Sequence, residues 1–118
     1  MMEKPQFPDN LDRMFEALAN HHRREMVYAL GLQPYAISQL AQQRGLSLTA
    51  IHRHVAILED AGLVIHRKIG RTHFLSLNKE ALRTLQHWLM QFQAYWGDNE
   101  ETLENYAHFL EPKKRERR

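Results

Sequence analysis

The residues best suited to chemistry lie on one side of a short segment between Ser47 and Ala61. Thr49, His52 and Arg53 recur there at helical spacing. Three apolar residues take the opposite side of a helix with about 3.6 residues per turn: Ile51, Val55 and Leu58. Arginine can donate two hydrogen bonds to a guanine or a phosphate, and threonine can bond a base edge. The polar side therefore favours contact with nucleic acid, and a solvated helix surface is the competing interpretation.

A second cluster of cations follows in a predicted β-hairpin. Strands over 63–69 and 72–77 are rich in β-branched and aromatic residues, and Gly70 between them suits a two-residue turn. Lysine and arginine at such a tip, next to a helix that reads DNA, would contact phosphates or a minor groove. An exposed turn kept soluble by charge is the alternative. The residues of the tip are His66, Arg67, Lys68, Gly70, Arg71 and Thr72.

The elements that must position these side chains follow from cap and turn residues. A helix over 37–44 ends at Gly45, which suits a left-handed C-terminal position. Ser47 can cap the next helix, 47–61, which stops at Gly62. Two helices joined by a tight glycine turn are typical of a helix-turn-helix.

Further helices are predicted before this unit. Asp9 or Asn10 can cap a first helix, and Asn20 can cap a second that runs from 21 to about 30 and breaks at Gly31. The first helix has apolar residues at the spacing of one face: Leu11, Met14, Phe15 and Leu18.

The C-terminal part carries an apolar seam at three–four spacing from 82 to 110. Asn78 can cap its helix, the seam has a gap at Asn99, and Gly97 can bend or split it. A small core cannot cover the whole seam, which points to a partner helix and hence to a symmetric dimer, with intramolecular packing as the alternative. The predicted fold is mainly α with a small β-hairpin: a winged helix-turn-helix with a long C-terminal dimerisation helix or helices.

Composition bounds the class of protein. The chain has 118 residues, 43% hydrophobic residues, no cysteine and a formal net charge of +2. Residues 21–73 are basic and residues 79–111 acidic, which favours a polyanion partner for the middle. Missing cysteines exclude disulfides, and no apolar run reaches the roughly 20 residues of a membrane helix, so we expect a cytoplasmic protein. The expected division is a flexible arm at 1–8, a winged helix with dimerisation helices at 9–97, a helix extension at 98–111 and a disordered basic tail at 112–118.

Metal and catalytic motifs are not found in the sequence. Eight histidines suggest a metal site, but the best pair of ligands is only Glu104 and His108, four residues apart. No phosphate-binding loop, nucleophile elbow or zinc-protease motif occurs. We therefore expect no enzyme, no cofactor and no metal. An apolar effector near the aromatic residues between 88 and 96 is a further hypothesis, with an aromatic core as the alternative.

Several stretches resemble the ArsR family of winged-helix transcriptional repressors. FEALANHHRREMVYAL is similar to the family's first two helices, ISQLAQQRGLSLTAIHRHVAILEDAGLV to its helix-turn-helix, and HRKIGRTHFLSL to its wing. The segment from Asn78 to Leu110 is similar to its C-terminal helices. Departures are the missing metal-sensing cysteine pair, Asn20-His21 in place of Asp-Pro, and Ala36 in place of a Ser or Thr cap, so that the third helix would fray at its start.

The resemblance implies roles for single residues. DNA contacts of the recognition helix would be Ser47, Leu48, Thr49, His52 and Arg53, and His54 would contact a phosphate or pack between helices. Phosphate contacts from the wing and backbone would come from Arg23, Arg67, Lys68 and Arg71. The homodimer would form through the first and the C-terminal helices, with an interface of Leu11, Phe15, Leu89, Phe92, Trp96, Leu103 and Tyr106.

The expected function is therefore sequence-specific DNA binding by a homodimeric repressor at a pseudo-palindromic operator, through helix 47–61 and wing 63–77. Double-stranded DNA and a second copy are the expected partners, a membrane is not, and an effector is unknown. One alternative is a winged-helix module that binds proteins. Another is a metal- or ligand-responsive repressor, which is compatible with DNA binding.

Overall fold

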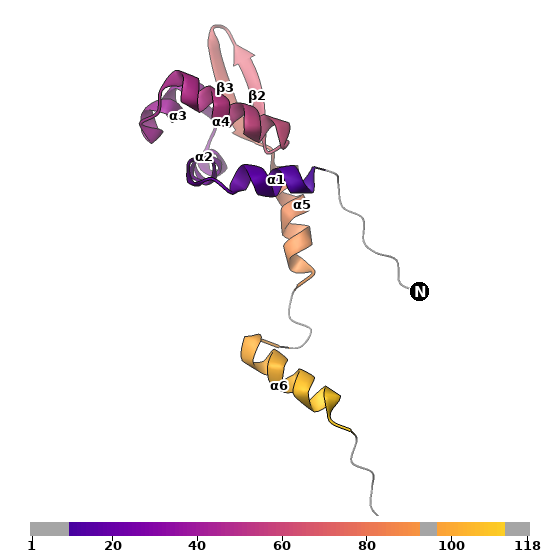
Figure 1. Ribbon diagram of the computed structural model, residues 1–118. Helices are drawn as coiled ribbons and strands as arrows, with labels where there is room; N and C mark the ends of the chain where they lie inside the picture. Colours follow the sequence, from indigo (N-terminus) through magenta and orange to yellow (C-terminus); the bar gives the residue numbers. More distant parts are fainter. Residues whose placement is uncertain (1–9, 93–96, 113–118) are drawn as a thin grey trace, which may run out of the picture. The chain divides into compact units, whose positions relative to one another are not determined.

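The structure is a computed structural model that describes residues 10–92 and 97–112. In these ranges it has six helices and three strands (Figure 1). The chain divides into two units, Met1–His87 and Trp88–Arg118. The helices are α1 Leu11–Leu18, α2 His21–Leu32, α3 Ile37–Arg44, α4 Leu48–Asp60, α5 Lys79–Met90 and α6 Asn99–Leu110, and the strands are β1 Tyr35–Ala36, β2 Val64–Ile69 and β3 Thr72–Leu77.

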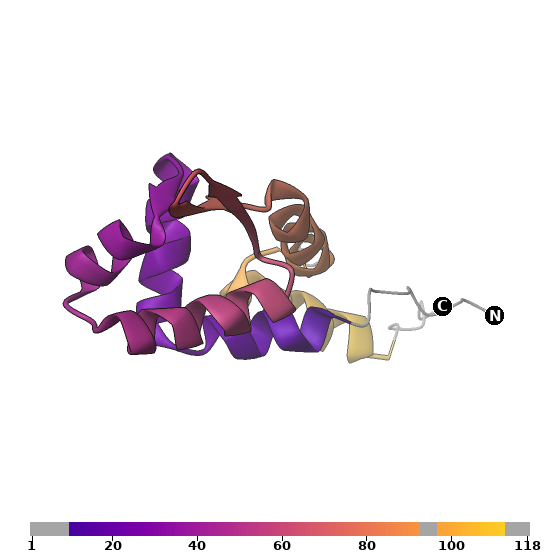
Figure 2. The same ribbon diagram turned by 90° about the horizontal axis from the view of Figure 1, so that it is seen from above.

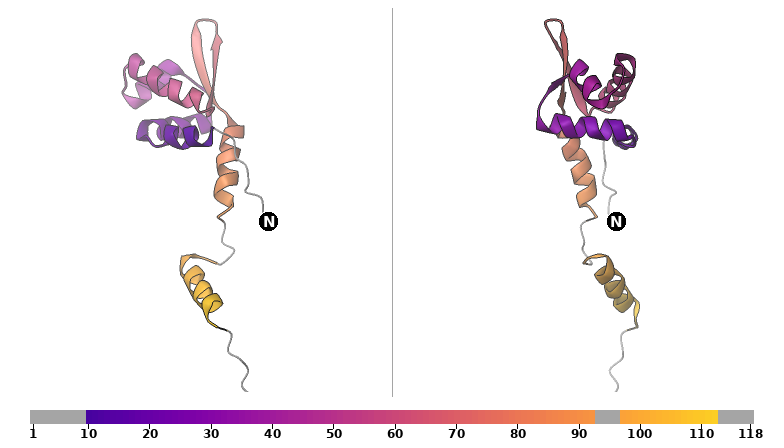
Figure 3. Two further views of the ribbon diagram at one scale, coloured as in Figure 1. Left: turned by 45° about the vertical axis from the view of Figure 1, so that its right-hand side comes forward. Right: turned by 90° about the vertical axis from the view of Figure 1, so that its left-hand side faces the viewer.

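The first unit is a winged helix-turn-helix, which confirms the predicted fold class. Helices α1 and α4 pack against each other (Figure 2), and the β2–β3 hairpin projects beyond the helices (Figures 1 and 3). The sheet is antiparallel in the order β1-β3-β2. One core joins all of these elements, and burial of its apolar side chains is the main stabilising force. Its largest fully buried side chains are Met14, Met26, Leu40, Ile51, Val55, Leu58, Leu63 and Leu75.

The helix-turn-helix forms where local signals place it. Gly45 adopts φ +65° after α3, a left-handed conformation that favours glycine. The Ser47 hydroxyl accepts a hydrogen bond from the Ala50 N–H at 3.1 Å and begins α4, and Asn20 caps α2 in the same way through Arg23 N–H. Gly70 also has positive φ, at the turn between β2 and β3. These four predictions are confirmed.

Three local predictions were wrong. Of the two candidate caps of α1, Asp9 lies outside the described residues and the Asn10 side chain does not cap: its Nδ2 donates to the Ala61 carbonyl, which ties the start of α1 to the end of α4. Helix α2 does not break at Gly31 but continues to Leu32. The start of α3 is not left open at Ala36, because the Ala36 N–H donates to Oε1 of Gln39 at 2.9 Å.

A third strand was not predicted. Residues Tyr35 and Ala36 pair with Leu75 and Phe74 of β3. The strand is two residues long, too short for any periodicity, and its pairing depends on a segment distant in sequence. It anchors the start of α3 on the sheet, and α3 in turn supports α4.

The C-terminal part contains two separate helices. Helix α5 ends at Met90, and α6 begins after Asp98, whose carboxylate accepts from the Glu101 N–H at 2.8 Å while the Glu101 carboxylate accepts from the Asp98 N–H. The predicted seam is therefore split, as Gly97 allows. No helix within 10–92 or 97–112 is both long and apolar enough to span a membrane. The predictions for the arm 1–8, for Trp96 and for residues 113–118 lie outside the described residues.

Candidate nucleic-acid interface

Helix α4 has one buried and one exposed side. Ile51, Val55 and Leu58 are at most 2% exposed and fix the rotation of the helix against the core. Thr49, His52 and Arg53 are consequently exposed, as the spacing predicts. Ser47 and Leu48 are also exposed, and they lie with Thr49 at the N-terminal end of the helix. A recognition helix presents base contacts from this end.

The exposed side of α4 and the hairpin tip border one shallow hollow of about 190 Å³. From α4 it is lined by Leu48 and His52, and from the hairpin by Arg71, Thr72 and His73, with Ser38 of α3 at its edge. Donors from two segments distant in sequence are thus brought to one surface. Such a surface can contact a groove and the adjacent backbone together.

A side-chain contact between Glu59 and His66 joins α4 to the hairpin, and His66 in turn contacts His73 within the hairpin. Nδ1 of His66 lies 3.2 Å from Oε1 of Glu59, and Nε2 of His66 lies 2.8 Å from Nδ1 of His73. The two imidazole rings meet edge to face at 4.9 Å. These contacts were missed from the sequence, because Glu59 and His66 flank the turn at Gly62 and nothing local marks their contact.

Strand alternation separates the cations of the wing. Lys68 pairs with His73 and shares the sheet face of His66, which is the face toward α4. Arg67 pairs with Phe74 and lies on the opposite, outer face. Lys68 and Arg71 therefore lie on the side or tip next to α4, whereas Arg67 does not.

The cations fall into two groups by their contacts. In the part of the chain that the structure describes, the side chains of Arg53, Arg67, Lys68 and Arg71 make no hydrogen bond or ion pair with other residues. Arginines of other elements do have side-chain partners: Arg44 contacts Glu25 at 3.6 Å and Nδ1 of His22 at 3.3 Å, Arg24 donates to the Leu18 carbonyl, and Arg83 lies 3.9 Å from Glu80. Unpaired exposed cations are suited to phosphate.

Arg23 and His54 are both half-buried and contact each other. Arg23 donates through Nε to the Ala17 carbonyl at 2.6 Å, and its Nη1 lies 3.1 Å from Nδ1 of His54. The His54 ring is also 5.6 Å from the ring of His22. Burial lowers the pKa of His54, and the nearby charges of Arg23, His22 and Arg53 lower it further. Of the two roles open for His54, packing between helices is the one that these contacts favour.

The predicted dimer residues lie mostly on exposed surfaces. Leu11 is half-buried against the core and Phe15 is 39% exposed. The others that the structure describes are between 49% and 72% exposed: Leu89, Phe92, Leu103 and Tyr106. Trp96 is outside the described residues, as is Tyr95 of the hypothetical effector pocket. Phe92 meets Trp88 at 4.8 Å between ring centroids.

The residues that the structure describes form no metal centre. Across 10–92 and 97–112 no three histidine, aspartate or glutamate side chains converge as metal ligands. The candidate pair Glu104 and His108 has no third ligand in these ranges, and Nδ1 of His108 lies 3.8 Å from Oε1 of Glu111.

Comparison with known proteins gives consistent matches. The profile of the bacterial regulatory protein, arsR family, matches residues 20–66. The HTH-type transcriptional regulator Rv2034 of Mycobacterium tuberculosis is 33% identical over 81 residues, which are 69% of this chain and 76% of that protein. The uncharacterized HTH-type transcriptional regulator YuzN of Bacillus subtilis is 36% identical over 83 residues, 64% of this chain and 90% of that protein. The crystal structure of the ArsR family transcriptional regulator RHA00566 has a TM-score of 0.71 at 30% identity and covers 81% of this chain and 99% of its own.

The helix-turn-helix, the cationic hairpin wing and the exposed polar side of α4, which carries Arg53, are the features of a winged-helix DNA-binding protein. The matches extend over this unit at the level of sequence and fold. The chain therefore belongs to the ArsR family of transcriptional regulators, a family that is not one of enzymes.

Proposed function

We propose that this regulator is a homodimeric repressor that binds a pseudo-palindromic operator in double-stranded DNA. Helix α4 would enter the major groove and the β2–β3 hairpin would follow the adjacent backbone. Two copies would place two α4 helices about 34 Å apart, one turn of B-DNA. Such a role implies a cytoplasmic protein without a catalytic site.

One observation carries the proposal: Thr49, His52 and Arg53 are exposed together on α4, opposite its buried stripe, and His52 borders the hollow beside the hairpin tip. Arg53 has the geometry to bind a guanine through two hydrogen bonds, and Thr49 can bond a base edge or contact a thymine methyl group. Ser47 and Leu48 border the same end of the helix. These five residues are the proposed base and groove contacts.

The phosphate contacts are assigned by position. Lys68 and Arg71 lie next to α4 and are proposed to hold the backbone beside the groove. Arg67 faces away from α4, so a phosphate that it contacts would lie beyond the hairpin. Arg23 and His54 hold α2 against α4, and we propose that their main role is to fix the angle of α4.

Exposed apolar side chains on three helices support the proposed dimer. Helix α6 has no buried residue in the described chain, although its Leu103, Tyr106, Phe109 and Leu110 are large and hydrophobic. Phe15 of α1 and Leu89 of α5 are exposed as well. Apolar side chains on several helices favour a partner, and a second copy is the simplest one.

Selection of bound fragments from random DNA, followed by footprinting, tests the function. We expect an enriched sequence with two-fold symmetry whose half-sites are one helical turn apart. Arg53→Ala should then bind the operator more weakly while binding to random DNA changes little, because a base contact specifies sequence. Failure to enrich any sequence, with a monomeric protein, would overturn the proposal.

The alternatives predict other outcomes. A winged-helix module that binds proteins would present an apolar exposed side on α4, whereas only Leu48 and Ile57 are large exposed hydrophobics there. A metal- or ligand-responsive repressor would select the same DNA but release it when the effector is added. Adding the effector after the selection experiment therefore distinguishes a responsive repressor from one without an effector.

A further inference from the structure

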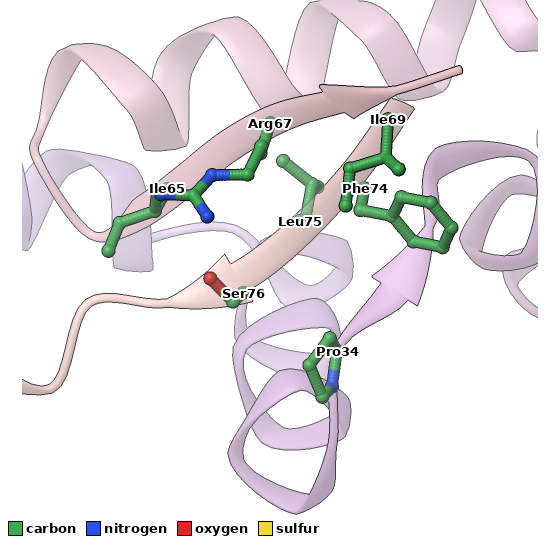
Figure 4. Close-up of a pocket in the computed structure, with 7 residues that line it drawn as sticks. All are labelled: Pro34, Ile65, Arg67, Ile69, Phe74, Leu75 and Ser76. Atoms are coloured by element: carbon green, nitrogen blue, oxygen red, sulfur yellow. The ribbon is translucent and has the colours of Figure 1, made fainter. Parts of the chain in front are cut away.

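The outer face of the sheet, opposite the face toward α4, carries a pocket. The pocket has a volume of about 360 Å³ and is lined by residues of both hairpin strands and by Pro34 before β1 (Figure 4). On β2 its residues are Ile65, Arg67 and Ile69, and on β3 they are Phe74, Leu75 and Ser76. It faces away from α4, because Ile65, Arg67 and Ile69 alternate with His66 and Lys68.

Apolar residues at these positions are unusual for a solvent-facing strand. Ile65 is 47% exposed and Ile69 is 60% exposed, although alternation would normally place polar residues on the outer face of an antiparallel sheet. Phe74 lies on the same face. The pocket is thus an apolar surface that the described chain leaves open, at the lower end of the volumes usual for small-molecule sites.

One charge lies within this apolar surface. Arg67 is the only charged residue among the seven that line the pocket, and its side chain makes no hydrogen bond or ion pair with the residues that the structure describes. Figure 4 shows its guanidinium group between Ile65 and Leu75. Ser76 pairs with Ile65 and is the diagonal neighbour of Arg67 on the same face, so its hydroxyl can join a ligand held by Arg67.

From these observations we propose that the pocket binds a small carboxylate with an apolar body. The carboxylate would accept two parallel hydrogen bonds from Arg67, and Ile65, Ile69 and Phe74 would contact the apolar part. A second copy of the chain fits less well, because a two-fold axis at this face would oppose two Arg67 side chains with no acidic lining residue. Duplex DNA fits less well because the isoleucines offer no hydrogen bond to phosphate.

The test uses the full isotope-labelled chain and octanoate as the probe, with amide NMR shifts as the readout. We expect saturable shifts confined to 65–69 and 74–76. Octanamide has the same chain but no charge and should bind the wild type at least about tenfold more weakly. Inorganic phosphate at equal concentration should give no comparable shifts, because it lacks an apolar body.

Two variants complete the test. Arg67→Met keeps the apolar stem and should weaken octanoate binding by at least about tenfold. Lys68→Met removes the same charge from the neighbouring residue on the other face and should leave the affinity unchanged. Equal binding of octanoate and octanamide, an unchanged affinity of Arg67→Met, or shifts outside the pocket would each overturn the proposal. The comparison of octanoate with octanamide uses only the wild-type protein, so it tests the proposal even if Arg67→Met fails to fold.

Discussion

Nη1 of Arg23 lies 3.1 Å from Nδ1 of His54, and this contact joins α2 to α4. The same guanidinium donates through Nε to the Ala17 carbonyl, so that one side chain connects the end of α1, the start of α2 and the middle of α4. Arginine can only donate, and Nδ1 of His54 must therefore accept. An accepting Nδ1 requires a neutral imidazole. Burial and the neighbouring Arg23, His22 and Arg53 favour that state, since each lowers the pKa of His54.

We predict that this ring makes the fold less stable in acid. The pKa of His54 is lower in the folded chain than the ordinary value of 6.5. Below 6.5 the unfolded chain therefore binds a proton that the folded chain resists, and the free energy of unfolding falls as the pH drops toward the lowered pKa. Above 6.5 both states are neutral at this residue and its contribution no longer changes.

Urea unfolding of the wild type and of His54→Asn over about pH 5 to 7.5 measures this effect. Asparagine offers an acceptor to Arg23 but does not titrate, and all other histidines are shared by the two proteins. We expect a smaller loss of stability in acid for His54→Asn. Identical pH slopes would show that His54 does not carry the effect.

A second prediction concerns Arg23 itself. Arg23→Met should lower the free energy of unfolding by about 1–3 kcal/mol, because the Ala17 carbonyl and His54 lose a charged donor in a partly buried place. Arg24→Met is the matched control: its exposed side chain makes one described hydrogen bond, to the Leu18 carbonyl. Equal unfolding midpoints in urea for the two variants would contradict the structural role of Arg23.

Short-range signals explain why the helix-turn-helix could be predicted from the sequence. Ser47 caps through Ala50 and Asn20 through Arg23, each within three residues. The turn at Gly45 depends on its own backbone. Contacts between distant segments could not be predicted in this way. The Asn10 side chain, for example, donates to the Ala61 carbonyl instead of capping its own helix. Likewise β1 exists only because β3 offers it a partner.

The same division applies to the candidate site. Helical spacing was enough to place Thr49, His52 and Arg53 on the exposed side of α4. The buried apolar stripe that includes Ile51 fixes the rotation of this helix against the core. The partners of Arg23 and His66 needed the tertiary structure. Arg67 and Lys68 are neighbours in a predicted strand, so strand alternation already places their side chains on opposite faces of the sheet. Grouping both residues as one basic tip left this difference out.

The turn of the helix-turn-helix gives a third prediction. Gly45 has φ +65°, and a Cβ added there would meet no atom within 4 Å, so a substitution causes backbone strain and no steric clash. Gly45→Ala should cost about 1–2 kcal/mol of unfolding free energy. Gly45→Asn should cost less, because asparagine tolerates the left-handed conformation better.

Gly31→Ala provides the control for this effect. Gly31 lies inside α2, and an added Cβ would meet only Cδ2 of Leu77 at 3.9 Å, an ordinary contact. Alanine should therefore be neutral or stabilise the helix by up to about 1 kcal/mol. Thermal unfolding of the three variants checks the order, and a Gly45→Ala protein as stable as the wild type would contradict it.

The wing gives a fourth prediction, which concerns salt dependence. Lys68 lies on the face toward α4 and has no described partner, so Lys68→Ala should weaken binding to operator and random DNA alike. The slope of log K against log salt should fall by about 1, because one phosphate contact is lost. Fluorescence anisotropy over a series of salt concentrations measures both. Lys79→Ala, at the start of α5, should leave the slope unchanged, and equal slopes for Lys68→Ala and the wild type would remove Lys68 from the interface.

The last prediction concerns the second unit. Leu103 on α6 is 72% exposed in the single chain, and Leu32 on α2 is 70% exposed, so exposure alone does not distinguish the two residues. If α6 is a dimer surface, Leu103→Asp places a charge in a buried interface and should shift the protein toward monomer, whereas Leu32→Asp should not. Sedimentation equilibrium of both variants gives the masses. Because a monomer contacts only one half-site, Leu103→Asp should also lose most of its affinity for a two-half-site operator while its binding to a single half-site is retained. A dimeric Leu103→Asp protein would show that α6 does not hold the two copies together.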